Sequence, residues 1–480
     1  MVKCDKNMTF QECELNILRN AVDKIETIEG SRMVHNPEVQ RMISIVEEYL
    51  RKKELICYGG TAINNILPEH DQFYNKNINL PDYDFFSKNA LDNAKELADI
   101  FVKEGYNEVE AKSGMHPGTY KVFVNFIPIA DITYLVDEIY DALKREAIEI
   151  DGIFYTPPDY LRMSMYLELS RPRGDVSRWE KVLKRLTLLN KYYPLEGYKC
   201  NNQEIQRRME TKSIDTTMLF EKLRQILVNQ GVIFFGSMAV SVLTHTAGGR
   251  NKKINKIPDF DVLAVNPKRI ATIVKDRLKY LGLTGIKIKH NKSIGEVISE
   301  HYEVMINNET IVMIYRPLAC HSFNIIHYKK MAIKIATIDT MLSFYLAFLY
   351  SKRPYYNPDR IVCLATELFN IQKQNRLNQN GLLKRFTINC YGKQETLDDI
   401  RSHKTNKYKE LMNKRGTREY EKYFLKYSPG EKKQTKMNTE KSQRPTRNGT
   451  KKNKNTKRTS KTKRNKKKKS IKNKNKNTIK

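Results

Sequence analysis

Three aspartates stand in two short apolar segments that alternate as strands do. Asp82 and Asp84 flank Tyr83, and because side chains on a strand alternate between faces, both carboxylates point to one side. Asp131 lies in a second such segment, residues 129–133. Two divalent ions held by carboxylates about 3.5–4 Å apart can align an attacking hydroxyl and a leaving phosphate. The three acids therefore indicate metal-assisted phosphoryl transfer, with Mg²⁺ or Mn²⁺ as the cofactor.

A glycine pair lies upstream, where it could meet the other end of a triphosphate. Gly59 and Gly60 follow the apolar segment 55–58, and Thr61 begins a predicted helix. Glycine lets backbone N–H groups approach phosphate oxygens closely, and a helix N-terminus favours an anion. Gly59, Gly60 and Thr61 are therefore candidate nucleotide-phosphate contacts.

A basic segment between residues 169 and 182 offers further phosphate ligands. Arg173, Arg178 and Lys181 could hold triphosphate or acceptor phosphates, arginine in a bidentate manner. The alternative is that Trp179 makes an apolar stripe with later residues of the same helix and that the charges form its solvated face.

Each of these signals alone has an ordinary explanation. Most isolated Asp-x-Asp pairs are surface or helix-cap residues, and a Gly-Gly pair after a strand is usually only a turn. Asp131 alone could be an N-cap or a salt-bridged core residue. The order strand, glycine pair, helix, Asp-x-Asp strand and third-aspartate strand is what favours the catalytic interpretation.

The elements around these residues recur at one offset, 177 residues further on. The predicted helix 37–52 meets residues 214–227, the glycine pair meets Gly236-Ser237, and residues 81–84 meet 258–261. A fixed offset over three landmarks predicts two copies of one α/β unit. The second copy keeps Asp259 and Asp261, but the position nearest to Asp131 falls on Met313 or a neighbour. Without a third acid the second copy is expected to be degenerate.

Composition sets the remaining domain boundaries. Residues 431–480 hold 22 Lys and Arg against two Glu and no aromatic residue, so they cannot bury enough apolar surface to fold. We expect an N-terminal helical segment (1–35), a catalytic domain (36–195), a degenerate copy of that domain (196–400) and a basic, largely disordered tail (401–480). The fold class is α/β (α+β), and the net charge of +32 favours a polyanionic partner.

Two further features suggest a soluble, intracellular protein. The seven cysteines show no CxxC pairing, which favours reduced thiols over a zinc module. No apolar run approaches the length of a membrane-spanning helix, and the N-terminus lacks the apolar core of a signal peptide.

The motifs together resemble a known superfamily. Residues 58–61, Asp82-Tyr83-Asp84 and Asp131 match, in order, the pattern of the DNA polymerase β-like nucleotidyltransferases. Residues 169–182 extend the resemblance to the catalytic subunits of poxvirus-type poly(A) polymerases, particularly the giant-virus (mimivirus-type) enzymes. The resemblance covers about residues 1–400.

The resemblance implies an activity and its partners. It implies template-independent polyadenylation of RNA 3′ ends with ATP, Asp82 and Asp84 as metal ligands, Asp131 as the third catalytic carboxylate, and Gly59, Gly60 and Thr61 as phosphate contacts. It also implies a viral protein of the virion and host cytoplasm. Poxvirus-type enzymes use a separate processivity subunit, whereas the giant-virus resemblance favours a homodimer. The alternatives are a terminal nucleotidyltransferase of other base specificity and an inactive basic RNA-binding scaffold.

Overall fold

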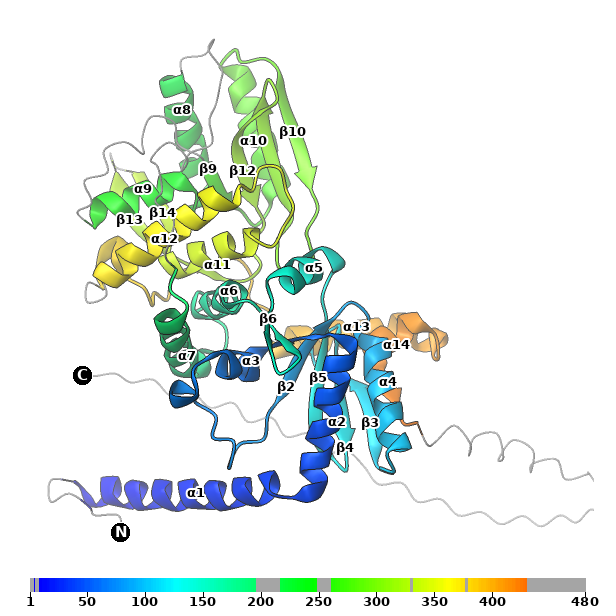
Figure 1. Cartoon of the computed structure of the whole chain (residues 1–480). Helices are drawn as coiled ribbons and strands as arrows, with labels where there is room; N and C mark the ends of the chain where they lie inside the picture. Colours follow the sequence, from blue (N-terminus) through cyan, green and yellow to red (C-terminus); the bar gives the residue numbers. More distant parts are fainter. Residues whose placement is uncertain are drawn as a thin grey trace, which may run out of the picture. The chain divides into compact units, whose positions relative to one another are not determined.

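The computed structural model describes Cys4 and residues 8–195, 216–247, 260–328, 331–375 and 379–429. Two eight-stranded sheets carry helices on their faces (Figure 1), so the predicted α/β class is confirmed. Each sheet belongs to one of two modules, which we call the first module (residues 37–192) and the second module (residues 216–374).

The first module begins where Asn36 caps a helix and Pro37 occupies its first turn. Its elements are α2 (Pro37–Lys53), β1 (Ile56–Tyr58), α3 (Gly59–Ile66), β2 (Tyr83–Ser87), α4 (Ala90–Lys103), β3 (Val109–Ser113), β4 (Thr119–Val124), β5 (Ile127–Tyr134), α5 (Asp137–Glu146), β6 (Ile148–Ile150), β7 (Ile153–Tyr155), α6 (Pro158–Leu169) and α7 (Trp179–Tyr192).

The two faces of the first sheet have different surroundings. Tyr83 and Phe85 are buried, and the Tyr83 hydroxyl donates to Glu47 of α2 over 2.6 Å. Phe86 lies on the opposite face, stacked on Tyr58 with ring centroids 4.0 Å apart. Because side chains alternate along β2, Asp84 shares the face of Phe86. We call this face the cleft face.

The second module repeats this sequence of elements, except that its described residues include no counterpart of α5. Its elements are α8 (Thr216–Asn229), β8 (Ile233–Phe234), α9 (Ser237–Thr246), β9 (Phe260–Leu263), α10 (Pro267–Tyr280), β10 (Ile286–Asn291), β11 (His301–Ile306), β12 (Glu309–Tyr315), β13 (His321–Tyr328), β14 (Met331–Ala336), α11 (Ile338–Phe348) and α12 (Pro358–Gln374).

The internal repeat is confirmed by strand order. Apart from one added edge strand in each sheet, the first sheet runs β3-β4-β5-β2-β1-β7-β6 and the second runs β10-β11-β12-β9-β8-β14-β13. The pairing of β1 with β7 is parallel, and so is that of β8 with β14. The two modules therefore share one topology.

Helices α6 and α11, which occupy equivalent places in the two modules, pack against each other. Every residue of α11 is buried. Tyr160 of α6 meets Tyr350 edge-on at 5.2 Å, and the Ser322 N–H donates to the Ser170 carbonyl over 2.8 Å. The helix that follows the parallel strand of each module thus forms the junction between them.

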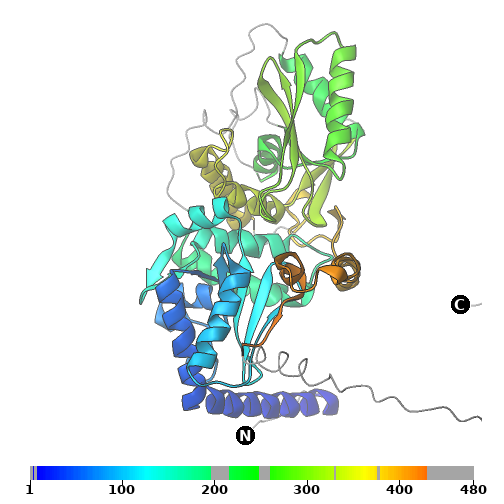
Figure 2. The ribbon, with the colours of Figure 1, turned by 90° about the vertical axis from the view of Figure 1, so that its right-hand side faces the viewer.

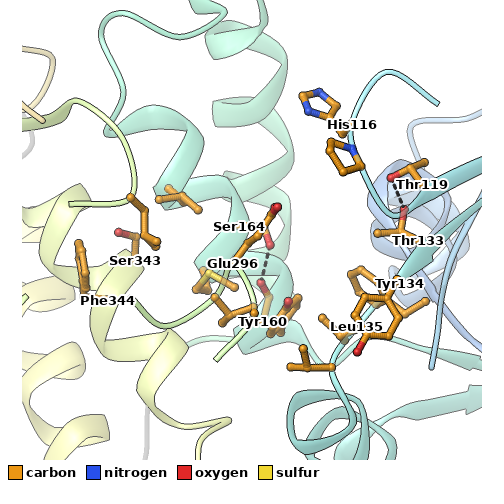
Figure 3. A pocket seen from close by; sticks show the side chains of 18 residues that line it. His116, Thr119, Thr133, Tyr134, Leu135, Tyr160, Ser164, Glu296, Ser343 and Phe344 are labelled. Carbon is orange, nitrogen blue, oxygen red and sulfur yellow. Dashed lines mark hydrogen bonds between the residues drawn. The ribbon is translucent and has the colours of Figure 1, made fainter. Parts of the chain in front are cut away.

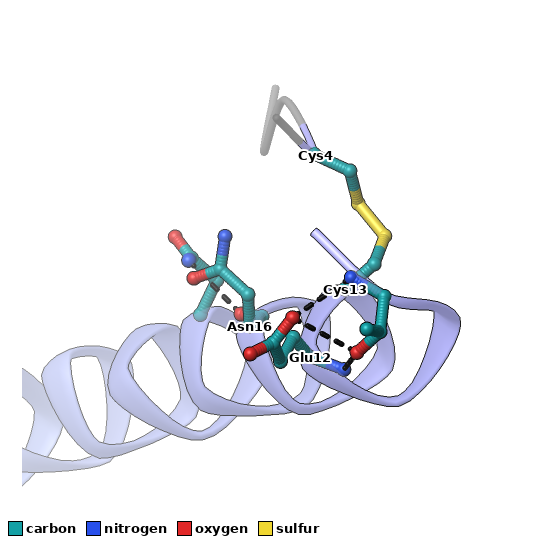
Figure 4. Close-up of a disulfide and its surroundings, with 6 residues drawn as sticks. Cys4, Glu12, Cys13 and Asn16 are labelled. Carbon is teal, nitrogen blue, oxygen red and sulfur yellow. Dashed lines mark hydrogen bonds between the residues drawn. A yellow bond between two sulfur atoms is a disulfide. The ribbon is translucent and has the colours of Figure 1, made fainter. Parts of the chain in front are cut away.

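The N-terminal helix α1 (Phe10–Val34) begins with a capping box. The Glu12 N–H donates to the Thr9 hydroxyl over 3.3 Å, and the Thr9 N–H donates to the Glu12 carboxylate over 2.8 Å. Figure 4 shows this start of the helix and the disulfide beside it. No residue of α1 is buried, so its apolar residues (Leu15, Leu18, Val22 and Ile25) do not contribute to a core here.

The prediction that the cysteines are reduced thiols is wrong for five of them (Cys4, Cys13, Cys320, Cys363 and Cys390). Cys4 is bonded to Cys13 (Figure 4), and Cys320 is bonded to Cys390. The second pair is 70 residues apart in sequence, but the pairing of β13 with the short strand β15 (Cys390–Tyr391) brings the two α-carbons to 5.1 Å. Sequence spacing could not show this contact, and cysteine usage does not support the expected reducing compartment.

The expected tail boundary at residue 401 also needs correction. Residue 401 lies inside helix α13 (Leu397–Leu411), which is followed by α14 (Arg418–Phe424) and β16 (Lys426–Tyr427). Strand β16 pairs with β3 at the edge of the first sheet, and Figure 2 shows these C-terminal helices in orange against its cyan strands. The part of the tail expected to be disordered, residues 431–480, lies outside the described residues.

Across the part of the chain that the structure describes, every helix is too short or too polar to span a lipid bilayer.

Because residue 401 lies inside helix α13, two truncated chains should differ in melting temperature. Ending the chain after Pro429 should leave the melting temperature unchanged, because it keeps β16. Ending it after Glu395 removes the pairing with β3 and the buried Leu425, worth about 2–3 kcal/mol for that side chain. The melting temperature should then fall by about 5 °C or more. Equal thermal unfolding of the two truncated proteins would contradict this assignment.

Candidate active site

A strand–turn–helix unit brings Gly59 against the first aspartate pair. Strand β1 runs antiparallel to β2, with Tyr58 opposite Asp84. Gly59 follows with φ +74°, and a Cβ on it would lie 2.6 Å from Asp84 Oδ2. Both the backbone conformation and the missing side chain therefore require glycine at this position.

The next residue is confined from the other side. A Cβ on Gly60 would lie 2.5 Å from the Tyr74 hydroxyl and 2.9 Å from Arg185 Nη1. Both glycines belong to the first turn of α3, whose backbone N–H groups have no acceptor within the helix. The turn thus presents bare donors beside a guanidinium, an arrangement suited to phosphate oxygens.

Thr61 has a structural contact that its sequence position did not suggest. Its side chain is buried, and its hydroxyl donates to the backbone carbonyl of Asp82 over 2.7 Å. The hydroxyl is therefore engaged, and a phosphate contact from Thr61 would have to come from its backbone N–H. The side chain instead ties α3 to the residue that leads into β2.

The third aspartate reaches the same face through strand register. Strands β2 and β5 are parallel, with Asp84 opposite Asp131, and β4 is antiparallel to β5, with Lys121 opposite Asp131. Residues directly opposite each other point to one face, so Asp84, Asp131 and Lys121 share the cleft face. Lys121 Nζ contacts the Asp131 carboxylate.

The surroundings of Asp82 and Asp84 disfavour the negatively charged form of both side chains. Burial, followed by the charges of Asp82 and Asp131, raises the pKa of Asp84 to about 7, against the opposing effects of Lys121 and Arg178. Burial and then Asp131 also raise the pKa of Asp82. A desolvated cluster of like charges is a common property of functional sites, and a divalent cation would relieve it.

The aspartates offer the oxygen ligands that such a cation requires, but their carboxylates do not converge on one point. Carboxylate oxygens are the ligands that Mg²⁺ prefers, and Asp82, Asp84 and Asp131 interact electrostatically. Among the described residues, no three His, Cys, Asp or Glu side chains form a ready-made set for a metal ion. Lys121 supplies the positive charge next to Asp131 instead.

Helix α7 places a row of cations opposite the glycine turn. Arg178, Lys181 and Arg185 are spaced three and four residues apart, which puts them on one face. The charge of Arg185, then burial and Arg178, lower the pKa of Lys181, while Asp82 acts in the opposite direction. Arg178 Nε lies 3.2 Å from a Glu168 carboxylate oxygen. The helix therefore directs concentrated positive charge toward the aspartates.

The apolar stripe of the alternative interpretation is present on one face of α7, and phosphate binding by the basic residues stays a prediction. Val182 and Leu186 are buried and Trp179 is partly buried, as a core stripe requires. Arg173 does not join the cations: it is exposed in the preceding turn and makes no ion pair with a described residue.

Several residues at the site were missed by the sequence analysis. Arg185 continues the spacing of Arg178 and Lys181, so extending the helix by one turn could have found it. Its guanidinium donates to the Tyr74 hydroxyl over 2.7 Å and lies 4.6 Å from the Phe73 ring centroid. Lys121 could have been found only by recognising the tight turn between β4 and β5.

The second module has the same register with different chemistry. Asp261 pairs with Met313, and Met313 pairs with Glu303, which are the positions of Asp84, Asp131 and Lys121 in the first module. The prediction that Met313 replaces the third acid is confirmed. Asp259 lies outside the described residues.

The equivalent of the cleft face is filled in the second module. Asp261 is only 6% exposed. The Tyr345 hydroxyl of α11 donates to the Phe235 carbonyl over 2.7 Å, directly before Gly236, and the Phe344 ring lies 5.0 Å from that of Phe235. Aromatic side chains of α11 therefore pack against the residue that precedes Gly236.

Comparison with known proteins gives a family match within the first module. Residues 44–175 match the family model described as poly(A) polymerase catalytic subunit. A protein of African swine fever virus (isolate Tick/Malawi/Lil 20-1/1983), named as a poly(A) polymerase catalytic subunit, is 33% identical over 36% of this chain and 38% of its own length. One of Acanthamoeba polyphaga mimivirus, named likewise, is 28% identical over 45% of this chain and 37% of its own length. The matches therefore span less than two-fifths of either relative.

A solved structure extends the likeness in fold. The crystal structure of the Megavirus polyadenylate synthase superposes with a TM-score of 0.73 at 20% sequence identity and covers 85% of both chains. At this identity the likeness establishes a shared fold, and it reaches beyond the first module. The resemblance found in the sequence is therefore confirmed: the segment that carries the glycine turn and the three aspartates matches the family of poly(A) polymerase catalytic subunits.

Proposed function

We propose that this chain transfers AMP from ATP to the 3′-hydroxyl of RNA without a template, and so acts as a poly(A) polymerase. The observation that carries the proposal is the register that sets Asp84 beside Asp131 on a desolvated face, with the glycine turn at one end. The family match to residues 44–175 supports it.

Each group has a distinct part in the reaction. Asp82, Asp84 and Asp131 would hold Mg²⁺ or Mn²⁺, which neutralises phosphate charge when bound. The N–H groups of the glycine turn, with Lys181 and Arg185, hold the β- and γ-phosphates. Asp131 accepts the proton of the attacking 3′-hydroxyl. A new bond forms between that oxygen and the α-phosphorus, and the bond from the α-phosphorus to pyrophosphate breaks.

The other parts of the chain have supporting roles in this proposal. The first module (within residues 36–195) is catalytic, and the second (within 196–400) is a degenerate copy. The basic segment 431–480 attracts RNA through counterion release. Processivity comes from a homodimer or from a separate subunit, and the viral relatives suggest the virion and host cytoplasm as its location.

The first test is extension of a short RNA by each nucleoside triphosphate. Wild-type protein with Mg²⁺ should extend it with ATP in preference to CTP, GTP or UTP. Asp84→Asn and Asp131→Asn should each slow extension by roughly 10²–10⁴-fold, whereas Asp259→Ala in the second module should retain it. Extension by the Asp84 and Asp131 variants at the wild-type rate would remove the assignment, and a preference for another base would favour a different terminal transferase.

A second test addresses the cations of α7. Lys181→Ala and Arg185→Ala should raise the KM for ATP by about 10–100-fold, because each removes a charged hydrogen-bond donor to phosphate. Lys184→Ala is a matched control on the same helix, since that side chain is 73% exposed and pairs with Glu180. An unchanged KM for ATP in the first two variants would place the triphosphate elsewhere.

A third test uses a matched pair of glycines. Gly59→Ala and Gly105→Ala both force alanine into positive φ (+74° and +97°), but only at Gly59 would the methyl group meet a carboxylate; around Gly105 the space is open. Both variants should lose about 1–2 kcal/mol of stability. Only Gly59→Ala should also reduce extension, by at least about tenfold, because it displaces Asp84. Equal activities of the two folded variants would argue against the close approach.

A further inference from the structure

A cavity of about 390 Å³ opens beside the aspartates, at the end of the strands away from the glycine turn. Its walls come from the ends of β2, β4 and β5, from α6, and from α11 and residues 295–297 of the second module. Figure 3 shows Thr119, Thr133 and Tyr134 on one side, Tyr160 and Ser164 in the middle, and Ser343 and Phe344 on the other. None of the residues assigned above to metal or phosphate lines this space.

The strand directions place the aspartates between the glycine turn and the cavity. Because β1 and β2 are antiparallel, Gly59 lies at the Asp84 end of β2. Phe86 lies two residues further along β2 and lines the cavity, as does Thr133, two residues beyond Asp131 on β5. Residues two apart on a strand share a face, so the cavity continues the cleft face past the acids.

Phosphoryl transfer requires separate spaces for the leaving group and for the acceptor. The attacking oxygen and the leaving oxygen stand roughly in line on opposite sides of the phosphorus. If pyrophosphate leaves toward Gly60, Lys181 and Arg185, the acceptor oxygen must approach from the other side of the aspartates. The cavity lies on that side.

We propose that this cavity receives the 3′-terminal nucleoside of the RNA acceptor, and that a neighbouring groove across Tyr134 holds the nucleotides before it. This inference rests on the proposed function and adds the location of the acceptor strand. It also gives the second module a direct part in the site.

The cavity has the polar groups that a ribose would need. The Thr133 hydroxyl lies 2.9 Å from the Tyr58 hydroxyl and 3.0 Å from that of Thr119. Each of these hydroxyls can donate or accept, so the row can bond to sugar hydroxyls next to Asp131. Among the described residues that line the cavity, Glu296 alone carries a full charge, and its carboxylate can accept from a hydroxyl or a base amino group.

The second module closes the cavity with a loop that fits tightly. Gly295 has φ +54°, and a Cβ on it would lie 3.3 Å from Val136. The loop therefore rests on the end of β5 and carries Glu296 into the cavity wall. The degenerate module thus provides a wall of the acceptor site in this proposal.

The groove continues outward over aromatic and basic side chains. Pro117 and Tyr134 line both the cavity and a second hollow of about 380 Å³, which Tyr423 and Lys422 of α14 also line. Tyr134 is 49% exposed. Exposed rings beside cations are the usual surface for single-stranded nucleic acid, because any base can stack on them.

Two of the three cations that line this second hollow already pair with carboxylates. Arg418 bonds to Asp92 over 2.6 Å and Lys88 lies 2.6 Å from Asp141. Lys422 is exposed and has no ion pair within the described part of the chain. It is therefore the cation best placed to meet an incoming RNA phosphate.

Photocross-linking of the full chain tests the placement without requiring turnover. One RNA carries 4-thiouridine at its 3′ end, and a second carries it at the third nucleotide from the end. The terminal probe should cross-link to residues 160–167 or 295–297, and the internal probe to residues 418–423. Cross-links of the terminal probe to α3 or α7 would reverse the proposed polarity and overturn the inference.

Extension by ATP is measured on the same protein. If the protein extends RNA but the cross-links fall on other residues, only the proposed position of the acceptor strand is refuted. If the cross-links fall on the expected residues but no nucleotide is added, the polymerase activity is refuted and the cavity is an RNA-binding site only.

Substitutions then separate the acceptor from ATP. Tyr134→Ala and Tyr423→Ala should raise the KM for RNA by about tenfold and leave the KM for ATP unchanged. Tyr280→Ala is the control, because that ring is 85% exposed on α10 of the second module, and it should change neither value. A raised KM for ATP with an unchanged KM for RNA would show that the cavity holds the incoming nucleotide instead.

Discussion

The packing of like charges on one desolvated face is the constraint around which the first module is arranged. Strand register fixes Asp84 opposite Asp131 and Lys121 opposite Asp131, so the distances between these charges cannot relax independently. Burial raises the pKa of Asp84 to about 7, which means that the folded chain maintains an unfavourable carboxylate cluster. Lys121 and the row of cations on α7 compensate for part of it, and bound cations would compensate for the rest.

Local patterns in the sequence were enough to find the residues that form this cluster. Gly59-Gly60, the alternation through Asp82 and Asp84, and the apolar surroundings of Asp131 depend on a few neighbouring residues each. The repeat at 177 residues was visible because the two modules share one topology, and it identified Met313 as the replacement for the third acid. Such features depend on backbone geometry and strand periodicity, which the sequence carries directly.

Contacts between distant segments were missed because no local pattern encodes them. Arg185 of α7 approaches Gly60 across more than 100 residues of chain, and Cys320 meets Cys390 only through pairing of β13 with β15. The boundary at residue 401 failed for the same reason. Composition there resembles a polar tail, but Leu425 is buried and its carbonyl accepts the Ser113 N–H over 3.1 Å.

The pairing of β16 with β3 has a consequence for how the protein is made. Lys426 and Tyr427 join Lys112 and Ala111 across more than 300 residues of chain, which is a contact of very long range. A nascent chain that has emerged from the ribosome only as far as the second module still has an open edge at its first sheet. The first module therefore reaches its final form only after residues 426 and 427 have left the ribosome, and until then an exposed β-edge is available for mispairing.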